Sequence, residues 1–240
     1  MAGTTPPEAE PDNLILRSVP DDESAAILPH LEMLDLPLGF KLYDASREIE
    51  FIYFPTRGVA SIVTEMKDTP VVEIATVGPE GMVGMPVLLE GGQGAHRAFM
   101  QVAGSGARMK ADAFRQLVRE CPGFNRILHR YALALMSQIA QNAACNRIHS
   151  VEERLARWLL MSHDRTRSDS FGLTQEFIAQ MLGVRRQTVS LAAGMLSKAG
   201  LISYVRGRIH ILDRKGLQAT ACECYDVIVS EFARLIGTPG

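Results

Sequence analysis

The stretch that most constrains the fold runs from Leu173 to Gly200 and reads as two short helices joined by a sharp turn. Thr174 can cap the first helix, because its hydroxyl can accept a hydrogen bond from a free N–H group of the first turn. Gly183 is placed to end that helix, since a left-handed backbone costs glycine little. The second helix then turns three side chains inward at helical spacing, namely Val189, Ala192 and Leu196. Two short helices arranged in this way predict a helix-turn-helix, whose second helix enters the major groove of DNA.

The outward face of the second helix carries side chains suited to reading bases. Arginine can make a bidentate contact with guanine, and glutamine can do the same with adenine. A plain helical hairpin with a solvated charged face is the alternative interpretation. On the DNA-binding interpretation, the expected contact residues, including those of the hairpin described next, are Thr174, Gln175, Arg185, Arg186, Gln187, Thr188, Ser190, Arg206 and Arg208.

A strand-rich segment, LISYVRGRIHIL, follows the two helices directly. Two runs rich in Ile, Val and Tyr flank Arg206-Gly207-Arg208, which predicts a β-hairpin with a basic tip. A hairpin in this place is a wing, positioned to touch the phosphate backbone beside the groove, whereas the alternative is an ordinary solvated turn. One last helix is expected from Leu217 to Ile236.

Charge is distributed unevenly along the chain. Its 240 residues have an ordinary globular composition, 47% hydrophobic and 22% charged, with a net charge of −2. Between Arg147 and Gly216, however, 12 Lys and Arg face 6 Asp and Glu, whereas the remainder carries 13 against 21. An acidic part joined to a basic part is typical of a protein in which one domain senses and the other holds a phosphate backbone.

The first half of the chain has the sequence pattern of a β domain. Residues 1–13 are expected to form a disordered tail, and Asp21–Leu34 a short helix with acidic residues in its first turn. Short β-rich runs then alternate with Gly, Pro and Asp turns as far as about Lys110, which predicts an antiparallel sandwich or jelly-roll barrel. The expected strands are Phe51–Phe54, Val59–Thr64, Val71–Val77 and Ala98–Val102.

A helix without charges follows the β domain. Tyr131–Asn146 contains no charged residue over about four turns, and a helix neutral on every side is buried on most of them. The predicted packing is on the β domain along one side and on a second copy of the chain along the other. A core helix wholly within one chain is the alternative. The expected dimer seam consists of Leu128, Tyr131, Leu135, Ile139 and Asn142. The next helix, Val151–His163, is expected to carry Arg154 and Arg157 on its polar side.

Neither the cysteines nor the histidines show a metal-ligand spacing. The cysteines, Cys121, Cys145, Cys222 and Cys224, do not form paired C-x-x-C units, and the six histidines are scattered. We therefore expect no metal and no cofactor, with the Cys222–Cys224 pair interpreted as two small buried side chains rather than a redox switch. An enzyme on the barrel, similar in outline to cupins, would need clustered ligands, and the barrel offers only His96, so no enzyme is expected. The N-terminal residues lack the apolar segment of a signal peptide and no membrane span is evident, which predicts a cytoplasmic protein.

In this order of elements the chain resembles the Crp/Fnr family of bacterial transcription regulators. The most specific part is Leu173–Leu201, together with Glu152-Glu153-Arg154-Leu155-Ala156 upstream and the glycine-rich VGPEGMVG segment, Val77–Gly84. The resemblance implies an α+β protein with an N-terminal cyclic-nucleotide-binding-type β-barrel (jelly roll), a long dimerisation helix and a C-terminal winged helix-turn-helix. The implied domains are residues 14–120 for the barrel, 124–148 for the dimerisation helix and 149–240 for the winged-helix domain with its C-terminal helix.

The resemblance also implies where bases and effector would bind. Family readers of bases match Arg186, Gln187 and Leu191, and because family members have Glu and Arg at the last two places, a different target sequence is implied. The family's pocket for cyclic AMP maps onto Gly84, Met85 and Arg97. Here Met85 replaces the carboxylate that holds the ribose, and no hydroxyl follows Arg97, so control by cyclic AMP is not expected. The cysteine cluster of the oxygen-sensing branch is missing before Cys121.

Together these features predict a homodimeric transcription regulator that reads a roughly palindromic site in double-stranded DNA. RNA polymerase and an unknown small effector are further candidate partners, and no membrane association is expected. The alternative hypothesis is a ligand sensor whose winged helix docks a protein partner rather than DNA. The sequence does not identify the effector or the operator.

Overall fold

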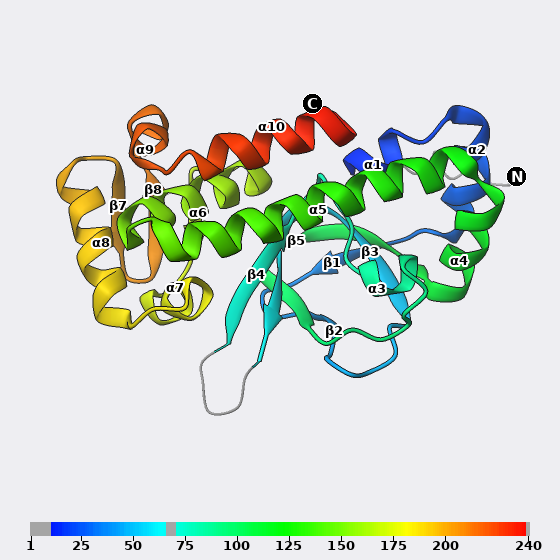
Figure 1. The fold of residues 1–240 in the computed structure, drawn as a ribbon, viewed down its shortest axis with the longest axis horizontal. Coiled ribbons are helices and arrows are strands. Elements are labelled where there is room, and N and C mark those ends of the chain that lie inside the picture. Colours follow the sequence, from blue (N-terminus) through cyan, green and yellow to red (C-terminus); the bar gives the residue numbers. More distant parts are fainter. Residues whose placement is uncertain (1–10, 66–70, 239–240) are drawn as a thin grey trace, which may run out of the picture.

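A mixed sheet-and-helix architecture places the β domain and the helix-turn-helix of α7 and α8 toward opposite ends of the molecule (Figure 1). The computed structural model describes residues 11–65 and 71–238 of the chain. The predicted tail lies mostly outside these residues, but Asn13 does not belong to a tail. It is fully buried, caps helix α1 (Leu14–Arg17), and donates to the carbonyl oxygens of Pro55 and Gly81 at 2.8 Å each. The ordered β domain therefore begins before residue 14.

The N-terminal helix is shorter than its apolar spacing predicts. Helix α2 covers Asp21–Ile27, a 3₁₀ turn covers Leu28–His30, and strand β1 already occupies Glu32–Leu36. Pro29 lies in this turn, and a proline cannot supply the N–H group that would continue the helix. The predicted helix over Asp21–Leu34 is thus wrong in its C-terminal half.

One antiparallel sheet forms the β domain, in the order β1-β5-β3-β4 with β2 pairing to β5. Two predicted strands, Phe51–Phe54 and Val59–Thr64, prove to be parts of one, because the chain passes through the register shifts around Gly58 without turning. Gly58 has a φ of 86°, which favours glycine, and across the ladder a Cβ on Gly104 would lie only 2.0 Å from the carbonyl oxygen of Arg57. The remaining strands are β2 (Lys41–Tyr43), β3 (Phe51–Thr64), β4 (Val72–Val77) and β5 (Arg97–Lys110).

Helix α5 (Pro122–Ile148) runs across the sheet. The last helix, α10 (Cys224–Ile236), lies along α5 (Figure 1). The shorter helices α3 (Met85–Leu88) and α4 (Ala111–Glu120) precede α5. Tyr131 donates from its hydroxyl to the carbonyl oxygen of Met82 at 2.9 Å, and its ring packs on Gly81 and faces Phe232 of α10. Helix α5 is therefore packed between the sheet and α10.

This packing corrects the predicted dimer seam. Leu128, Tyr131 and Leu135 are buried within the chain, Ile139 packs against the same core, and Asn142 donates to the carbonyl oxygen of Ile74 at 2.9 Å. The prediction picked the wrong face because the sequence does not show that α10 returns to cover α5. The outward face of α5 carries a different row at the same three- and four-residue spacing, namely Leu133, Met136, Ala140 and Ala143.

The C-terminal part is built on helix α6 (Val151–Thr166), which begins with a capping box between Ser150 and Glu153. Its elements are β6 (Ser170–Gly172), α7 (Gln175–Leu182), α8 (Arg186–Lys198), β7 (Ile202–Val205), β8 (Arg208–Ile211) and α9 (Arg214–Thr220), followed by α10. The single last helix expected over Leu217–Ile236 is broken at Ala221, so α9 and α10 are separate. Within the described ranges no helix is long and apolar enough to cross a membrane.

Arg154 and Arg157 do not lie on a solvated side of α6, as the sequence predicted, but are buried. A guanidinium N–H of Arg154 donates to the carbonyl oxygen of Leu182, an otherwise open acceptor in the last turn of α7. Arg157 donates to the side-chain oxygen of Asn142 at 2.6 Å. Both arginines therefore join α6 to its neighbours, a role that amphipathic spacing alone cannot reveal.

Candidate nucleic-acid interface

The helix-turn-helix forms from the residues that predicted it. Thr174 caps α7, and its hydroxyl accepts from the backbone N–H of Phe177 at 3.1 Å. Gly183 ends α7 in the left-handed conformation with a φ of 64°. Val189, Ala192 and Leu196 of α8 are buried. These contacts fix α8 against α7, so the opposite face of α8 is held outward on a rigid support.

The predicted base-reading side chains lie on this outward face. Arg185 is the N-cap of α8 and Arg186 its first residue, so both project from the helix end that enters a groove in helix-turn-helix proteins. A shallow groove separates the first turns of α7 and α8. It is lined by Gln175, Glu176, Ala179, Gln180, Val184, Arg185, Arg186, Gln187 and Ser190. Thr188 is half-buried and Leu191 is 70% exposed.

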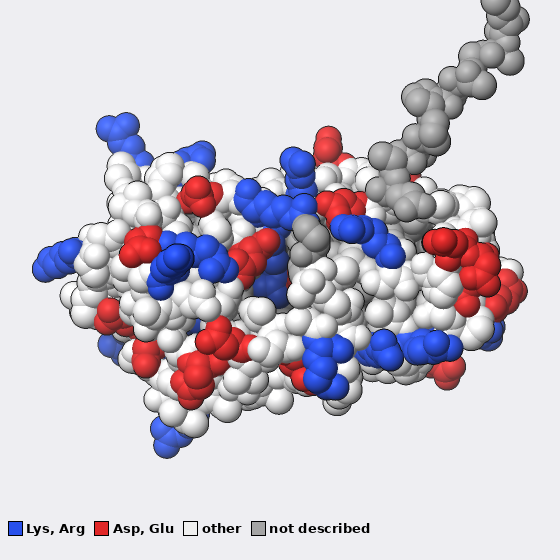
Figure 2. Space-filling model, turned by 90° about the horizontal axis from the view of Figure 1, so that it is seen from above, with Lys and Arg blue, Asp and Glu red and all other residues white. Residues whose placement is uncertain are grey.

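The hairpin β7–β8 forms the predicted wing. Arg206 and Gly207 occupy its tip with φ values of 50° and 75°, the two left-handed residues of a type I′ turn. The wing is tied to α7, because Tyr204 donates to the carbonyl oxygen of Leu173 at 2.9 Å and Leu173 N–H donates to Gly207 at 2.8 Å. Arg206 and Arg208 are exposed. Figure 2 shows basic side chains projecting at the end of the molecule where Figure 1 places α8, and a cluster of acidic side chains at the opposite end.

The DNA-binding part is joined to the sheet through buried polar contacts of α6. Glu73 of β4 accepts from Ser61 at 2.6 Å and from the indole N–H of Trp158 at 2.8 Å, and burial raises the pKa of this carboxyl to about 7. Arg165 donates to Glu80 at 2.7 Å, with both side chains at most 10% exposed. The glycine-rich segment that contains Glu80 therefore contacts the helix that supports α7 and α8.

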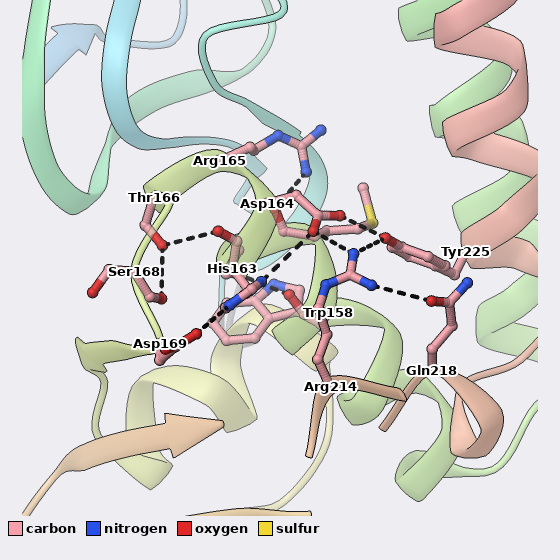
Figure 3. Close-up of polar contacts among 12 residues, drawn as sticks. Trp158, His163, Asp164, Arg165, Thr166, Ser168, Asp169, Arg214, Gln218 and Tyr225 are labelled. Atoms are coloured by element: carbon pink, nitrogen blue, oxygen red, sulfur yellow. Dashed lines mark hydrogen bonds and ion pairs between the residues drawn. The ribbon is translucent and has the colours of Figure 1, made fainter. Parts of the chain in front are cut away.

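A second polar network connects the end of α6 with α9 and α10 (Figure 3). Arg214 donates to Asp164 at 2.7 Å and to the hydroxyl of Tyr225 at 2.8 Å, and Tyr225 in turn donates to Asp164 at 2.6 Å. Burial raises the pKa of Tyr225 to about 12, so this hydroxyl keeps the proton that it donates. Through this network the orientation of α10 is linked to that of the wing-bearing domain.

The predicted effector residues lie on two different elements, Gly84 and Met85 at the start of α3 and Arg97 at the start of β5. Gly84 has a φ of 128° and precedes α3, where Met85 is the first residue. Arg97, at the start of β5, pairs with Glu65 at 2.9 Å and lies over the ring of Phe99, which stacks edge-on against Phe177 of α7. Alternate residues of a strand face opposite sides of the sheet. The side chain of Arg97 therefore points toward α7, whereas that of its neighbour Ala98 points into the core. Its charge is already balanced by a carboxylate, which a phosphate would have to displace.

One group of side chains that the sequence analysis had dismissed is assembled by the fold. Cys145, His149, Cys222 and Cys224 place their ligand atoms within 4.8 Å of one another. The spacing along the sequence therefore failed to show that these four side chains lie close together in the folded chain. Two local signals were present, Cys145-x-x-x-His149 at one helical turn and Cys222-x-Cys224, but nothing in the sequence joined them.

The comparisons with known proteins agree with this architecture. Residues 153–220 match the model of the Crp-like helix-turn-helix domain. The CRP-like cAMP-activated global transcriptional regulator of Mycobacterium tuberculosis is 24% identical over 214 residues, covering 86% of this chain and 96% of that protein. Among solved structures, FixK2 from Bradyrhizobium japonicum has a TM-score of 0.67 at 17% identity, over 80% of this chain and 98% of its own. A CRP family regulator from Thermus thermophilus has a TM-score of 0.66 at 21% identity, over 78% and 96%.

The sheet, the long helix and the exposed face of α8 define a winged-helix fold with an N-terminal domain of the cyclic-nucleotide-binding type. Residues 153–220 form a Crp-like helix-turn-helix domain, and the chain as a whole is similar to Crp-family transcription regulators. The predicted resemblance to the Crp/Fnr family and the predicted α+β fold are thereby confirmed.

Proposed function

We propose that the chain is a homodimer that binds a roughly palindromic site in double-stranded DNA, with base reading by Arg186 and Gln187 of α8 and backbone contacts by the wing. The observation that carries this proposal is the outward face of α8, which is exposed, basic at its first turn and rigidly supported by α7. Arg186 can donate two hydrogen bonds to a guanine edge, and Gln187 can pair with adenine. Arg206 and Arg208 at the wing can hold phosphates without selecting a sequence.

Dimer formation is proposed through the outward row of α5. Leu133 is 48% exposed and Met136 65% exposed, and Ala140 and Ala143 continue the row with side chains small enough for two helices to approach. Large exposed apolar side chains at a repeating three- and four-residue spacing are typical of a helix that packs against a second helix. A two-fold axis along this row would relate two copies of α8 and so give the target site its symmetry.

We further propose that cyclic AMP does not control this chain, although the relative from Mycobacterium tuberculosis is described as cAMP-activated. A bound ribose needs an acceptor for its hydroxyl groups, and Met85 offers none. A bound cyclic phosphate needs an available guanidinium, whereas Arg97 is engaged by Glu65. These two features support the proposed independence from cyclic AMP.

A gel-shift titration of selected duplex DNA tests this proposal. Wild-type chain is expected to retard a preferred fragment with an affinity that falls steeply with salt and is unchanged by added cyclic AMP. Arg186→Ala should cost about 1–3 kcal/mol and relax base preference at one position of each half-site. Arg206→Ala should instead weaken binding to all sequences alike and reduce the salt slope by about one.

Arg47→Ala is the matched control, because Arg47 is exposed in the β domain, outside the proposed interface. It should bind as wild type does. An unchanged sequence preference in Arg186→Ala would show that this residue is not a reader. Binding that appears only with cyclic AMP would refute the proposed independence from that ligand. A chain that retards no fragment would favour docking of a protein by the wing.

A further inference from the structure

We propose that Cys145, His149, Cys222 and Cys224 form a tetrahedral metal site of the zinc class at the junction between α5, α6 and α10. Two of the ligands come from the end of α5, where Cys145 lies in the last turn and His149 is the C-cap. The other two come from the break between α9 and α10, where Cys222 lies in the connection and Cys224 is the first residue of α10. Three thiols and an imidazole are a ligand set that binds zinc in structural sites.

The spacing of the ligand atoms fits one ion rather than a cluster. The Sγ atoms of Cys145 and Cys222 are 3.5 Å apart, as are Sγ of Cys224 and Nδ1 of His149, and all four ligand atoms lie within 4.8 Å of one another. Tetrahedral zinc with bonds of about 2.0 to 2.3 Å separates its ligand atoms by roughly 3.5 to 3.8 Å. An iron–sulfur cubane holds each thiolate on a different iron and needs a wider opening.

The backbone holds these ligands in place independently of any metal. The N–H of His149 donates to the carbonyl oxygen of Cys145 at 3.1 Å, so the two side chains leave the helix one turn apart on the same side. The N–H of Tyr225 donates to the carbonyl oxygen of Cys222 at 3.1 Å, which curls the Cys222–Cys224 segment around the site. The three cysteines pack as a cluster of their own, separate from the main apolar core. The three cysteines therefore do not serve as small apolar side chains of the main core.

Side chains around the four ligands complete the features of a metal site. Glu223 contacts Nε2 of His149 at 3.1 Å, leaving Nδ1 directed toward the sulfur atoms, and a carboxylate in this position orients a metal-bound imidazole. Gln141 donates to the sulfur of Cys224 at 3.1 Å. Such outer contacts fix both the tautomer of the histidine and the direction of the thiolate lone pairs.

Charge balance points the same way. Arg154 and Arg157 are buried beside the cluster, and among the described residues neither forms an ion pair with a carboxylate, although the carboxyl of Glu73 lies near Arg157. The Nε atom of each guanidinium also lacks a hydrogen-bond partner within the described part of the chain. Buried cations are costly unless a negative group lies close. A divalent ion with three thiolates and a neutral imidazole carries a net charge of −1, which would supply that group.

Titration of the reduced full-length chain with Co²⁺ and Zn²⁺ tests the proposal. The chain should take up one ion, with the near-ultraviolet thiolate-to-cobalt band and strong visible bands of tetrahedral Co²⁺, and excess Zn²⁺ should remove these bands. Cys222→Ser and Cys145→Ser should each weaken Co²⁺ binding and lower the intensity of the thiolate band, because each leaves two of the three thiolates. Glu223→Gln, which leaves all four ligands in place, should lower zinc affinity by about 10-fold to 100-fold.

Cys121→Ser is the matched control, because Cys121 is a buried free thiol at the opposite end of α5. It should bind Co²⁺ as wild type does. Circular dichroism identifies a variant that fails to fold, and His149→Gln then serves as the second ligand variant. The proposal is overturned if reduced wild-type chain gives no thiolate-to-cobalt band, or if folded Cys222→Ser keeps the wild-type band intensity and Co²⁺ affinity. It is also overturned if mass spectrometry of the chain isolated from cells shows Cys145 and Cys222 joined as a disulfide without metal.

Discussion

At the residue scale, Glu73 is a carboxyl group whose pKa is raised by folding. It is buried between β4 and α6, accepts from Ser61 and Trp158, and lies near the charges of Arg157 and Arg165. Burial is the largest effect and raises its pKa from 4.5 to about 7, because water no longer solvates the carboxylate. Glu73 therefore makes the contact between the sheet and the DNA-binding part sensitive to pH.

The sign of this dependence follows from proton binding. Between pH 4.5 and about 7 the folded chain keeps the proton of Glu73 while the unfolded chain loses it, so the free energy of unfolding falls as pH rises through this window. The loss reaches at most about 3 kcal/mol above pH 7, from roughly 1.4 kcal/mol for each unit of pKa. Urea denaturation of wild type and Glu73→Gln across this range measures it.

The Glu73→Gln side chain keeps a hydrogen-bond acceptor and the shape of Glu73 but does not titrate. The free energy of unfolding of this variant should therefore not fall between pH 4.5 and about 7. Exposed Glu50→Gln is the control and should follow wild type. Parallel curves for wild type and Glu73→Gln would show that the carboxyl of Glu73 does not change its protonation between pH 4.5 and 7.

Single residues could be predicted where their role depends on neighbours in the chain. Thr174 and Gly183 were predicted as helix ends because a cap and a left-handed turn are set within four residues. Arg154 could not be placed, because its buried partner, the carbonyl oxygen of Leu182, is 28 residues away. Cys145 and Cys222 are separated by 77 residues, so their proximity depends on the path of the whole chain.

At the scale of elements, α5 shows why a correct helix can be assigned the wrong face. Its neutrality indicated burial on most sides, and the sheet and α10 do bury the row that includes Tyr131. The sequence could not decide which apolar row faces outward, since both rows recur at three- and four-residue steps. That choice is made by α10, whose return to α5 depends on the break between α9 and α10.

The outward row of α5 gives a direct prediction about assembly. Met136→Glu would place two like charges at the proposed two-fold contact, so the dimer should dissociate. Sedimentation equilibrium should then report a mass of about 26.3 kDa instead of twice that value. DNA affinity should also fall when the dimer dissociates, because a monomer has one recognition helix and binds only one half-site.

Leu89→Glu is the matched control, since Leu89 is also a large exposed apolar residue, 61% exposed, but lies beside α3. It should remain dimeric. A wild-type chain that sediments as a monomer at concentrations sufficient for DNA binding would contradict the proposed seam. A Met136→Glu variant that remains a dimer would place the interface elsewhere.

At the scale of the whole molecule, the two parts are joined by contacts that any change in their relative orientation must break. Glu73–Trp158, Glu80–Arg165 and Phe99–Phe177 each pair the β domain with α6 or α7. The proposed metal site adds a fourth connection, at the point where α5 ends and α6 begins. A signal at the β domain or at the proposed metal site would thus act on DNA affinity by shifting the population of relative orientations, without a new DNA contact.

The overall order of domains could be predicted because each domain depends on a local pattern. These patterns are the evenly spaced β runs, the neutral helix and the capped helix pair. What brings the domains together could not, because side chains such as Glu73 and Arg165 carry no local sign of their partners. The effector pocket shows the limit of resemblance in the same way. Arg97 occupies the expected position in the sequence, and in the structure it pairs with Glu65, a contact that the resemblance did not predict.

The most direct test of the central claim is selection of bound sites from random duplex DNA by the full-length chain. Two copies of α8 related by a two-fold axis should enrich an inverted repeat whose half-sites are centred about 34 Å, or one helical turn, apart. Selection with Arg186→Ala should keep this spacing and lose preference at one base pair in each half-site. A motif without two-fold symmetry, or no enriched motif at all, would contradict the account.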